Sequence, residues 1–360
     1  MTTKPKIALC LPGGGVTGAM YQIGALAALE DLVSGFEATN LDLYVGTSSG
    51  ASVAASLAGG VPVQRMYRAL LDPADVYFPL ERRHLLRMDL GEWRRALGTL
   101  FGAARQGSAS LIRRGPSPSP QALWEELDRF YDSLPAGVFT LDGYERFLED
   151  FFARRGVPNN FPAMPKPLRV VAHDLDSGAP VVFGGAGFEH VPVSRACTAS
   201  SAIPPFFSPV RIRDRFYIDA GAAQVAHVDV AARSGVDVLV VVNPMVAVQA
   251  EGVPTGHGHR PSVRDKGYMW VANQAIRIGM QTLLREAVAR IRAEGNVGVV
   301  LVEPEATDGV LFMFSPASFT GRRTMLEHAY RQTRTQVAAL LANGSESVAR
   351  AGWTIRAADA

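Results

Sequence analysis

Gly13-Gly14-Gly15-Val16-Thr17-Gly18 and Gly46-Thr47-Ser48-Ser49-Gly50 are two glycine-framed turns that lie close together near the N-terminus. Each turn follows a short, largely apolar run, Ile7 to Leu11 in the first case and Leu41 to Val45 in the second. Each also precedes a stretch of small residues that is compatible with a helix, which we expect over Ala19 to Leu32 after the first turn. The order predicts a strand, a turn and a helix, repeated once.

The second turn has the G-x-S-x-G form of a nucleophile elbow, with Gly46 and Gly50 on either side of Ser48. In such an elbow, small flanking residues let the serine occupy a tight strand-to-helix turn with its hydroxyl oxygen exposed. The N-terminus of the following helix would also help to hold negative charge. The pattern therefore predicts that Ser48 is a nucleophile.

The first turn offers backbone N–H groups that no side chain covers, at Gly13, Gly14 and Gly15, with Gly18 completing the motif. Amide groups at a helix start are suited to binding a developing anion. The two turns together predict a serine hydrolase whose oxyanion hole precedes its nucleophile in the chain.

A dinucleotide-binding turn is an alternative interpretation, because Gly13-x-Gly15-x-x-Gly18 also fits the Rossmann fingerprint. That fingerprint requires an acidic residue at the end of the next strand. The acid found near this spacing, Glu37, precedes the second strand instead. The position of Glu37 argues against a nicotinamide or flavin cofactor.

The composition fits a globular chain, with 360 residues, 48% hydrophobic and 19% charged. The net charge of +2 gives no indication of nucleic acid binding. Two distant cysteines, Cys10 and Cys197, provide no disulfide framework, and we expect both to be reduced, buried thiols. No signal peptide or spanning segment is visible, so the expectation is a soluble, cytoplasmic protein.

Residues 61 to 165 differ in character from the rest of the chain, since they contain no convincing long strand. Between Glu81 and Gly115 there are eight arginines against three acidic residues, interleaved with Trp93, Leu100 and Phe101. We predict a helical, Arg-rich cap over the site that makes peripheral contact with anionic membranes, with Arg94 and Arg95 among the contacting residues. An ordinary solvated helical insert is the alternative. The Pro-Ser run at 116 to 120 is a predicted hinge.

Strand signals resume at Leu168. They predict a hairpin (168 to 172 and 180 to 183), a strand from Arg215 to Ile218 and a buried parallel strand from Val238 to Val242. The C-terminal part, about 246 to 360, is predicted to be a helical extension, with helices at about 266 to 294 and 322 to 342 and a strand at 297 to 302. A Gly-, Pro- and His-rich loop at 246 to 265 is predicted to be a lid.

A nucleophilic serine needs a base, and the sequence offers two kinds. His227 and His328 lie late enough in the chain for a Ser-His-Asp esterase. Asp219 ends a predicted strand and is followed by Ala220-Gly221. Such a carboxylate can accept the serine proton directly if a dry site raises its pKa.

The motifs Gly13 to Gly18, Gly46 to Gly50 and Asp219-Ala220-Gly221, in this order, resemble those of the patatin-like phospholipase family, over roughly residues 5 to 245. The resemblance implies a single domain with a three-layer α/β/α fold and a mostly parallel sheet. It also implies a Ser48–Asp219 dyad, an oxyanion hole at Gly13 to Gly15, and hydrolysis of lipid acyl esters through an acyl-enzyme. Neither a metal ion nor an organic cofactor is implied.

Two departures from the family pattern stand out. The third motif is usually Asp-Gly-Gly or Asp-Gly-Ala, whereas Ala220 replaces its middle glycine here, at a cost of about 1 kcal/mol if the position requires a positive φ. The basic residue often found in the first motif is absent, with Val16 and Thr17 in its place. Ala220 motivates a further alternative, a catalytically weak lipid-binding protein.

Overall fold

The computed structural model describes residues 4–72, 74–99, 124, 128, 131, 133–222, 227–249, 262–308, 310, 314, 318–343 and 349–356. Its centre is an eight-stranded mixed sheet in the order β11-β10-β1-β3-β6-β9-β8, with β7 paired to β6. The parallel strands are β1 (Ile7–Leu11), β3 (Leu43–Thr47), β6 (Leu168–Asp174), β10 (Val238–Val242) and β11 (Gly298–Val302). The antiparallel pairings involve β7 (Pro180–Phe183), β8 (Val210–Ile212) and β9 (Arg215–Asp219).

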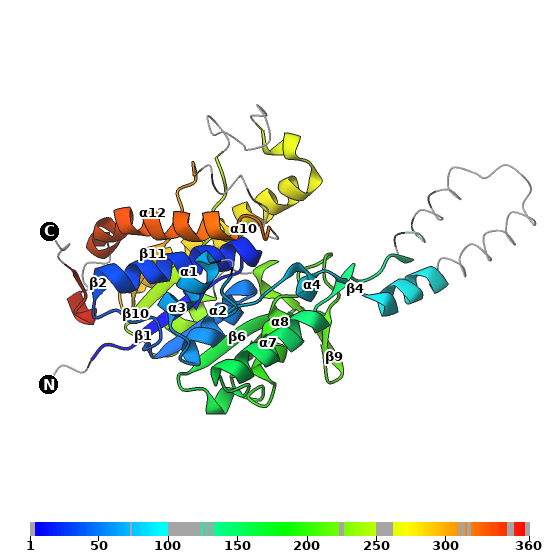
Figure 1. Ribbon diagram of the computed structural model, residues 1–360, viewed down its shortest axis with the longest axis horizontal. Coiled ribbons are helices and arrows are strands. Elements are labelled where there is room, and N and C mark those ends of the chain that lie inside the picture. The colour runs from blue at the N-terminus through cyan, green and yellow to red at the C-terminus, as the bar shows by residue number, and fades with distance from the viewer. Residues whose placement is uncertain are drawn as a thin grey trace, which may run out of the picture.

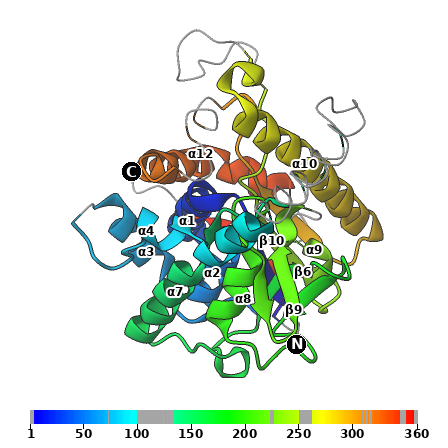
Figure 2. The same ribbon diagram turned by 90° about the vertical axis from the view of Figure 1, so that its right-hand side faces the viewer.

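Helices cover both faces of this sheet (Figures 1 and 2). One face packs against a set of six helices: α1 (Gly15–Leu32), α2 (Ser49–Ala58), α3 (Val63–Leu71), α7 (Asp142–Arg155), α8 (Val193–Ser200) and α12 (Arg322–Asn343). The other face packs against α9 (Val228–Ala232) and α10 (Tyr268–Glu294). The predicted three-layer α/β/α fold with a mostly parallel sheet is therefore confirmed.

The alternation of side chains along the central strands explains this layering. In β1, Leu9 and Leu11 face the larger helical layer, whereas Ala8 and Cys10 face α9 and α10, and all four are fully buried. A strand buried on both faces is apolar throughout, which is the pattern of the sequence at this point. Cys10 and Cys197 are both free and buried, as predicted.

The element boundaries differ from the predicted ones at the two glycine turns. Helix α1 begins at Gly15, four residues before the expected start, because the helix continues directly from the glycine turn. Strand β3 covers Leu43–Thr47 and so ends at the residue before Ser48. The predicted hairpin at 168 to 183 and the two long C-terminal helices are confirmed.

The region from 61 to 165 is attached to the domain at both of its ends. Helices α3 and α7 contribute to the core of the larger helical layer, for example through Met66 and Leu148. Between them lie α4 (Arg82–Leu85) and the two-stranded ribbon of β4 (Arg87–Met88) and β5 (Phe139–Thr140). Residues 100 to 123, which include the predicted hinge at 116 to 120, lie outside the described residues. So do residues 250 to 261 of the loop that is predicted to be a lid.

The remaining short elements complete the architecture. Near the two termini, β2 (Val33–Ser34) pairs with β12 (Thr354–Ile355), at the end of the molecule opposite α4 and β4 (Figure 1). Three short 3-10 helices cover Phe161–Ala163, Ala220–Ala222 and Val263–Lys266. None of the described helices combines the length and the apolar character that crossing a bilayer requires.

Candidate active site

The candidate active site is built where β1 and β3 end and where β9 ends beside β6. Thr47, the residue before Ser48, pairs with Val171 of β6. The next residue of β6, Ala172, pairs with Asp219 at the end of β9. Val171 and Ala172 are neighbours in β6, so the residue before Ser48 and Asp219 itself are paired side by side. Ser48 and Asp219 therefore lie together although they are 171 positions apart in the sequence.

Ser48 occupies a strained elbow. Its φ of 55° and ψ of −131° lie in a region that residues other than glycine rarely adopt, and α2 begins at the next residue. The elbow has no room for a side chain at either of its glycines. A Cβ on Gly46 would lie 2.5 Å from the Cα of Ala51, and one on Gly50 would lie 2.2 Å from the carbonyl oxygen of Leu11.

A serine on α8 holds the backbone of the elbow. The hydroxyl Oγ of Ser200 accepts the N–H of Ser48 at 2.8 Å and donates to the carbonyl oxygen of Val171 at 2.5 Å. Both contacts are buried, so this hydroxyl fixes the elbow to β6. The role of Ser200 is not predictable from its local sequence, because nothing there shows that α8 approaches the elbow.

Asp219 is a buried carboxyl beside Ser48, the predicted nucleophile. Burial raises the pKa of Asp219 to about 6, and this rise is partly opposed by hydrogen bonds from the side chain of Ser48 and from the N–H of Gly221, at 2.7 Å. Its own N–H donates to the carbonyl of Ala202 at 3.0 Å. A base with a pKa close to neutrality is well matched to proton transfer at physiological pH.

The departure at Ala220 carries no backbone strain. Ala220 begins a 3-10 turn and does not have a positive φ, so the cost considered for a left-handed alanine does not arise. Its methyl group is fully buried and belongs to the apolar cluster that includes Met280 of α10. Alanine therefore fits this turn and contributes to packing.

The glycine turn lies directly beside the nucleophile. A Cβ on Gly13 would lie 2.7 Å from the Cβ of Ser48, and Gly14 has a φ of 152° and precedes the first residue of α1. Among the described residues, no acceptor binds the N–H groups of Gly13, Gly14 or Gly15. Gly18 closes the first turn of α1 by donating to the carbonyl of Gly14 at 3.0 Å.

The segment Asn243–Val246, which follows β10, packs against the glycine turn. Cβ atoms on Gly14 and Gly18 would lie 2.9 Å and 3.2 Å from the Cγ of Pro244. Inside the segment, the N–H of Met245 donates to the side-chain oxygen of Asn243 at 3.0 Å. The side-chain nitrogen of Asn243 donates to the carboxylate of Glu303 at 2.6 Å, and its backbone N–H donates to the carbonyl of Val302 at 2.9 Å, so the end of β11 helps to hold the segment.

A buried arginine of α10 holds the same segment from the other side. The guanidinium of Arg277 donates to the carbonyl oxygens of Pro244 and Val246, at 3.3 and 3.0 Å, and to the side chain of Asn273 at 2.8 Å. Arg277 is only 5% exposed, and burial lowers its pKa to about 10. Sequence reasoning missed this residue, since one arginine within a long helix carries no distinguishing signal.

The two candidate histidines, His227 and His328, have hydrogen-bonding surroundings that do not include Ser48 or Asp219. His328 is paired with Asp308, and His227 is buried with its Nε2 unpartnered within the described residues. Burial is the largest influence on His227 and lowers its pKa to about 4. Neither histidine is hydrogen-bonded to Ser48 or Asp219.

A family model described as patatin-like phospholipase matches residues 9–232, which include both glycine turns and Asp219. The chain belongs to the patatin-like phospholipase family. The match contains every element of the patatin-like site described above except the Asn243–Val246 segment and the residues that hold it.

Individual relatives of this patatin-like chain are distant. It is 26% identical over 220 residues to the uncharacterized protein YqhO of Bacillus subtilis, covering 59% of this chain and 60% of that protein. Two solved structures are similar at low identity. VipD from Legionella pneumophila matches with 17% identity and a TM-score of 0.38, over 93% of this chain and 67% of that one. Human GIVD cytosolic phospholipase A2 matches with 12% identity and a TM-score of 0.39, over 97% of this chain and 60% of that one.

Proposed function

We propose that this protein is a serine acyl hydrolase that cleaves carboxylic esters of lipids, with Ser48 as nucleophile and Asp219 as base. The observation that carries the proposal is the buried Asp219 carboxyl, hydrogen-bonded to Ser48 at a strained elbow. Membership of the patatin-like phospholipase family supports lipid esters as the substrate class.

The first half of the reaction forms an acyl-enzyme. The Oγ of Ser48 attacks the ester carbonyl carbon while its proton passes to Asp219. The carbonyl oxygen becomes an oxyanion, which the N–H groups of Gly14 and Gly15, at the positive end of α1, stabilise. The intermediate then collapses, the bond to the alcohol oxygen breaks, and that oxygen takes the proton from Asp219.

The second half of the reaction restores the enzyme. Asp219 accepts a proton from water, whose oxygen attacks the acyl carbon, and the second oxyanion occupies the same amide groups. When this intermediate collapses, the fatty acid leaves and Ser48 regains its proton from Asp219. No step requires a histidine, because the raised pKa of Asp219 lets one carboxyl both accept and return the proton.

The experiment that tests this proposal is labelling of the purified protein with a fluorophosphonate, which reacts with activated serines. We expect labelling of the wild type, none for Ser48→Ala and a strongly reduced rate for Asp219→Asn. A folded wild type that does not react would contradict the proposal and favour the lipid-binding alternative. Hydrolysis of short-chain and long-chain esters by the same variants would then define the acyl preference.

We also infer that the enzyme works at a membrane surface, which it contacts through the Arg-rich region. The structure modifies how this contact is assigned to individual residues. Arg95 is paired with Glu92 at 2.8 Å, and the indole N–H of Trp93 donates to the carbonyl of Val138 at 3.3 Å. These two side chains thus have partners within the protein.

A further inference from the structure

We propose that a basic pocket between α4 and α7, together with the apolar residues beside it, is the surface by which this protein binds an anionic phospholipid bilayer. The proposal rests on the lipid substrate proposed above and identifies the docking surface. The basic pocket is a hollow of about 460 Å³. Its lining consists of Pro79, Glu81, Arg83, His84, Arg87, Gly143, Arg146, Phe147, Asp150 and Arg154.

The charge of the basic pocket is not balanced internally. Arg83 pairs with Glu81 at 3.1 Å and Arg154 pairs with Asp150 at 2.9 Å, so both acidic residues of the lining already have a cation. Within the described part of the chain, no carboxylate lies within ion-pair distance of Arg87 or Arg146. Two guanidinium groups facing one hollow suit a phosphate group, which arginine binds through paired hydrogen bonds.

The walls of the basic pocket are held in place before any ligand arrives. The backbone N–H of Glu81 donates to the Nδ1 of His84 at 3.0 Å, and the ring of His84 stacks on Phe147 of α7 with centroids 5.2 Å apart. A Cβ on Gly143 would lie 2.8 Å from the carbonyl oxygen of His84, so α4 and α7 are in close contact. A preformed site loses little conformational entropy when it binds.

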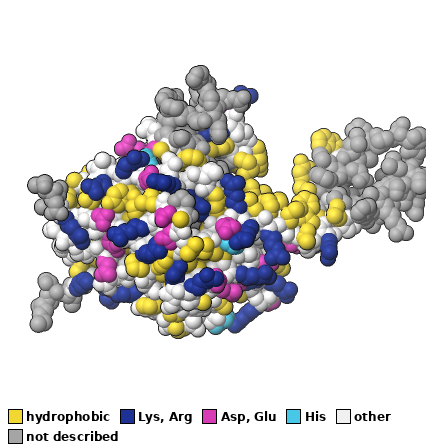
Figure 3. Space-filling view, in the orientation of Figure 1, with side chains coloured by type: hydrophobic (Ala, Val, Ile, Leu, Met, Phe, Trp, Pro, Cys, Tyr) yellow, Lys and Arg dark blue, Asp and Glu magenta, His cyan; other side chains and the backbone are white. Residues whose placement is uncertain are grey.

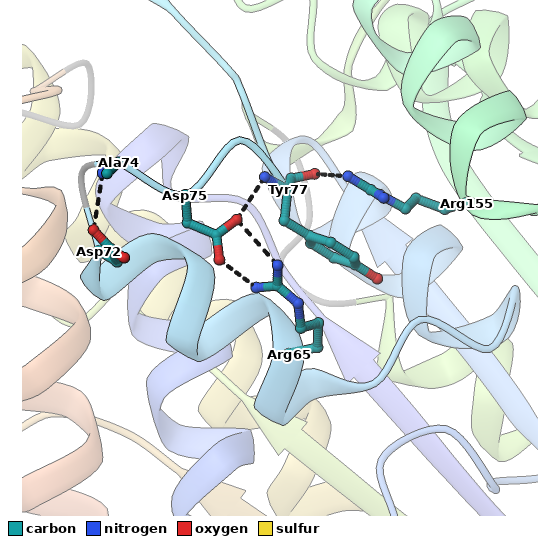
Figure 4. Close-up of polar contacts among 6 residues, drawn as sticks. All are labelled: Arg65, Asp72, Ala74, Asp75, Tyr77 and Arg155. Atoms are coloured by element: carbon teal, nitrogen blue, oxygen red, sulfur yellow. Dashed lines mark hydrogen bonds and ion pairs between the residues drawn. The ribbon is translucent and has the colours of Figure 1, made fainter.

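The segment that leads into the basic pocket is equally constrained (Figure 4). Arg65 of α3 forms a two-point ion pair with Asp75, at 2.7 and 3.0 Å, and Asp75 also accepts the N–H of Tyr77. Arg155 of α7 donates to the carbonyl of Tyr77 at 2.9 Å, and the guanidinium groups of Arg65 and Arg155 both lie over the tyrosine ring, 4.1 and 3.7 Å from its centre. This clamp fixes the chain three residues before Leu80, whose carbonyl accepts a hydrogen bond from Arg322.

Exposed apolar side chains continue directly from the basic pocket. Leu86, Met88 and Leu90 alternate with Arg87 and Asp89, and they are 50%, 52% and 63% exposed. Leu97 and Trp124 are two further large apolar side chains that are exposed. Figure 3 shows Lys and Arg side chains gathered over α4 and α7, with apolar side chains beside them. Apolar residues beside basic ones favour a bilayer over a soluble phosphate, since lipid offers both an acyl boundary and anionic head groups.

This surface lies at the same end of the molecule as the candidate active site. In Figure 1, α4 and β4 lie toward the end where α1 begins, away from the two chain termini. The ribbon of β4 and β5 is joined to the site by backbone contacts. The N–H of Phe139 in β5 donates to the carbonyl of Phe206 at 2.8 Å, and Phe206 lies in the loop after Ala202. The carbonyl of Ala202 in turn accepts the N–H of Asp219. A bilayer bound at this surface would therefore lie near the catalytic residues.

Vesicle co-sedimentation of the full chain carrying Ser48→Ala tests the proposal, since binding is then measured without catalysis. The vesicles are phosphatidylcholine alone or an equimolar mixture of phosphatidylcholine and phosphatidylglycerol. We expect binding to the mixture only, weakening as salt concentration rises. The Arg87→Gln/Arg146→Gln variant should bind about thirty-fold more weakly, as expected for two basic residues at an anionic surface. The matched control, Arg233→Gln/Arg290→Gln, should bind nearly as well as the parent.

Several outcomes would overturn the proposal. Equal losses in the pocket and control variants would show that only overall charge matters. Unchanged binding by Leu86→Ser/Met88→Ser/Leu90→Ser would exclude the apolar contact. A thermal shift with inorganic phosphate but no vesicle binding would indicate a soluble phosphate ligand instead. Thermal unfolding of each variant establishes that it is folded. Because the assay requires no turnover, absence of esterase activity in the wild type would count against the proposed function and not against this surface.

Discussion

Gly13 lies directly against Ser48, so that a Cβ built on this glycine would be 2.7 Å from the Cβ and 3.2 Å from the Oγ of the serine. The glycine turn and the Ser48 elbow are therefore in contact through a position that has no room for a side chain. Whatever displaces one turn displaces the other.

Gly13→Ala should accordingly impair chemistry more than stability. The added methyl group has to push Ser48 or the glycine turn aside, and loss of alignment with one oxyanion donor costs about 100-fold in kcat. The check is the rate of fluorophosphonate labelling together with ester hydrolysis. Gly279→Ala is the matched control, because the corresponding position on α10 opens onto free space. Equal activity of the two variants would contradict the assigned role of the turn.

We expect Asp219 to set the pH dependence of the proposed activity. With a pKa of about 6, the carboxyl is a base only when ionised, so kcat/KM should rise with pH through about 6 and level off above it. Asp219→Asn should lower kcat by about 10²- to 10⁴-fold and abolish this rise. A profile that keeps its inflection near 6 in Asp219→Asn would assign the titration to another group.

The raised pKa of Asp219 also predicts how the stability of the protein depends on pH. Its pKa is raised on folding from 3.8, so the native state binds the proton more tightly, and the stability that this provides is lost as pH rises toward about 6. Above that pH the buried charge costs up to about 3 kcal/mol. Asp219→Asn should thus raise the melting temperature relative to wild type at about pH 8 but not at about pH 4. A lower melting temperature for Asp219→Asn at about pH 8 would mean that the fold stabilises Asp219 as an anion.

The histidines distinguish a Ser-Asp dyad from a Ser-His-Asp triad. His227→Asn preserves a side chain tolerant of the left-handed backbone at this position, where φ is 41°, and His328→Gln keeps a hydrogen-bonding partner for Asp308. Both variants should retain turnover within about tenfold, far less than the loss expected for a missing base. Loss of labelling in a folded variant of either histidine would favour the triad.

Arg277 should act on the reaction through the Asn243–Val246 segment. Arg277→Met leaves the carbonyls of Pro244 and Val246 without their donor, and the segment that packs on Gly14 loosens. We expect kcat to fall about tenfold, equivalent to 1.4 kcal/mol, with KM little changed. Arg277→Lys should restore part of the rate. Arg290→Met, on the exposed side of the same helix, is the control, and a change confined to KM or to unfolding temperature would contradict a positioning role.

Much of the candidate site can be predicted from the sequence, because the proposed chemistry depends on local geometry. An elbow needs glycines at fixed offsets from Ser48, and an oxyanion hole needs amides without side chains, so both leave a visible pattern. Asp219 was identified because it ends a strand-like run, and β9 does end there. The alternating and continuous apolar runs likewise predicted the strands of the sheet.

Other parts of the candidate site depend on which strands are neighbours in the sheet, and the local sequence does not show this. The segment at Asn243 reaches the glycine turn because β10 pairs in parallel with β1, so that both strands end at the same edge. Ser200 and Arg277 belong to helices whose register against the sheet is fixed only by the packed fold. The start of α1 was placed too late because glycines were interpreted as a turn, although the helix already begins at Gly15.

The backbone of Ser48 limits which nucleophiles could evolve at this position. A φ of 55° is a genuine outlier for a β-branched residue, because the second substituent on Cβ crowds the backbone. Threonine, a capable nucleophile elsewhere, is thus excluded by conformation before its reactivity is considered. Cysteine has the same unbranched shape as serine. A lineage that exchanged its nucleophile here would therefore become a thiol enzyme, and never a threonine enzyme, without rebuilding the turn.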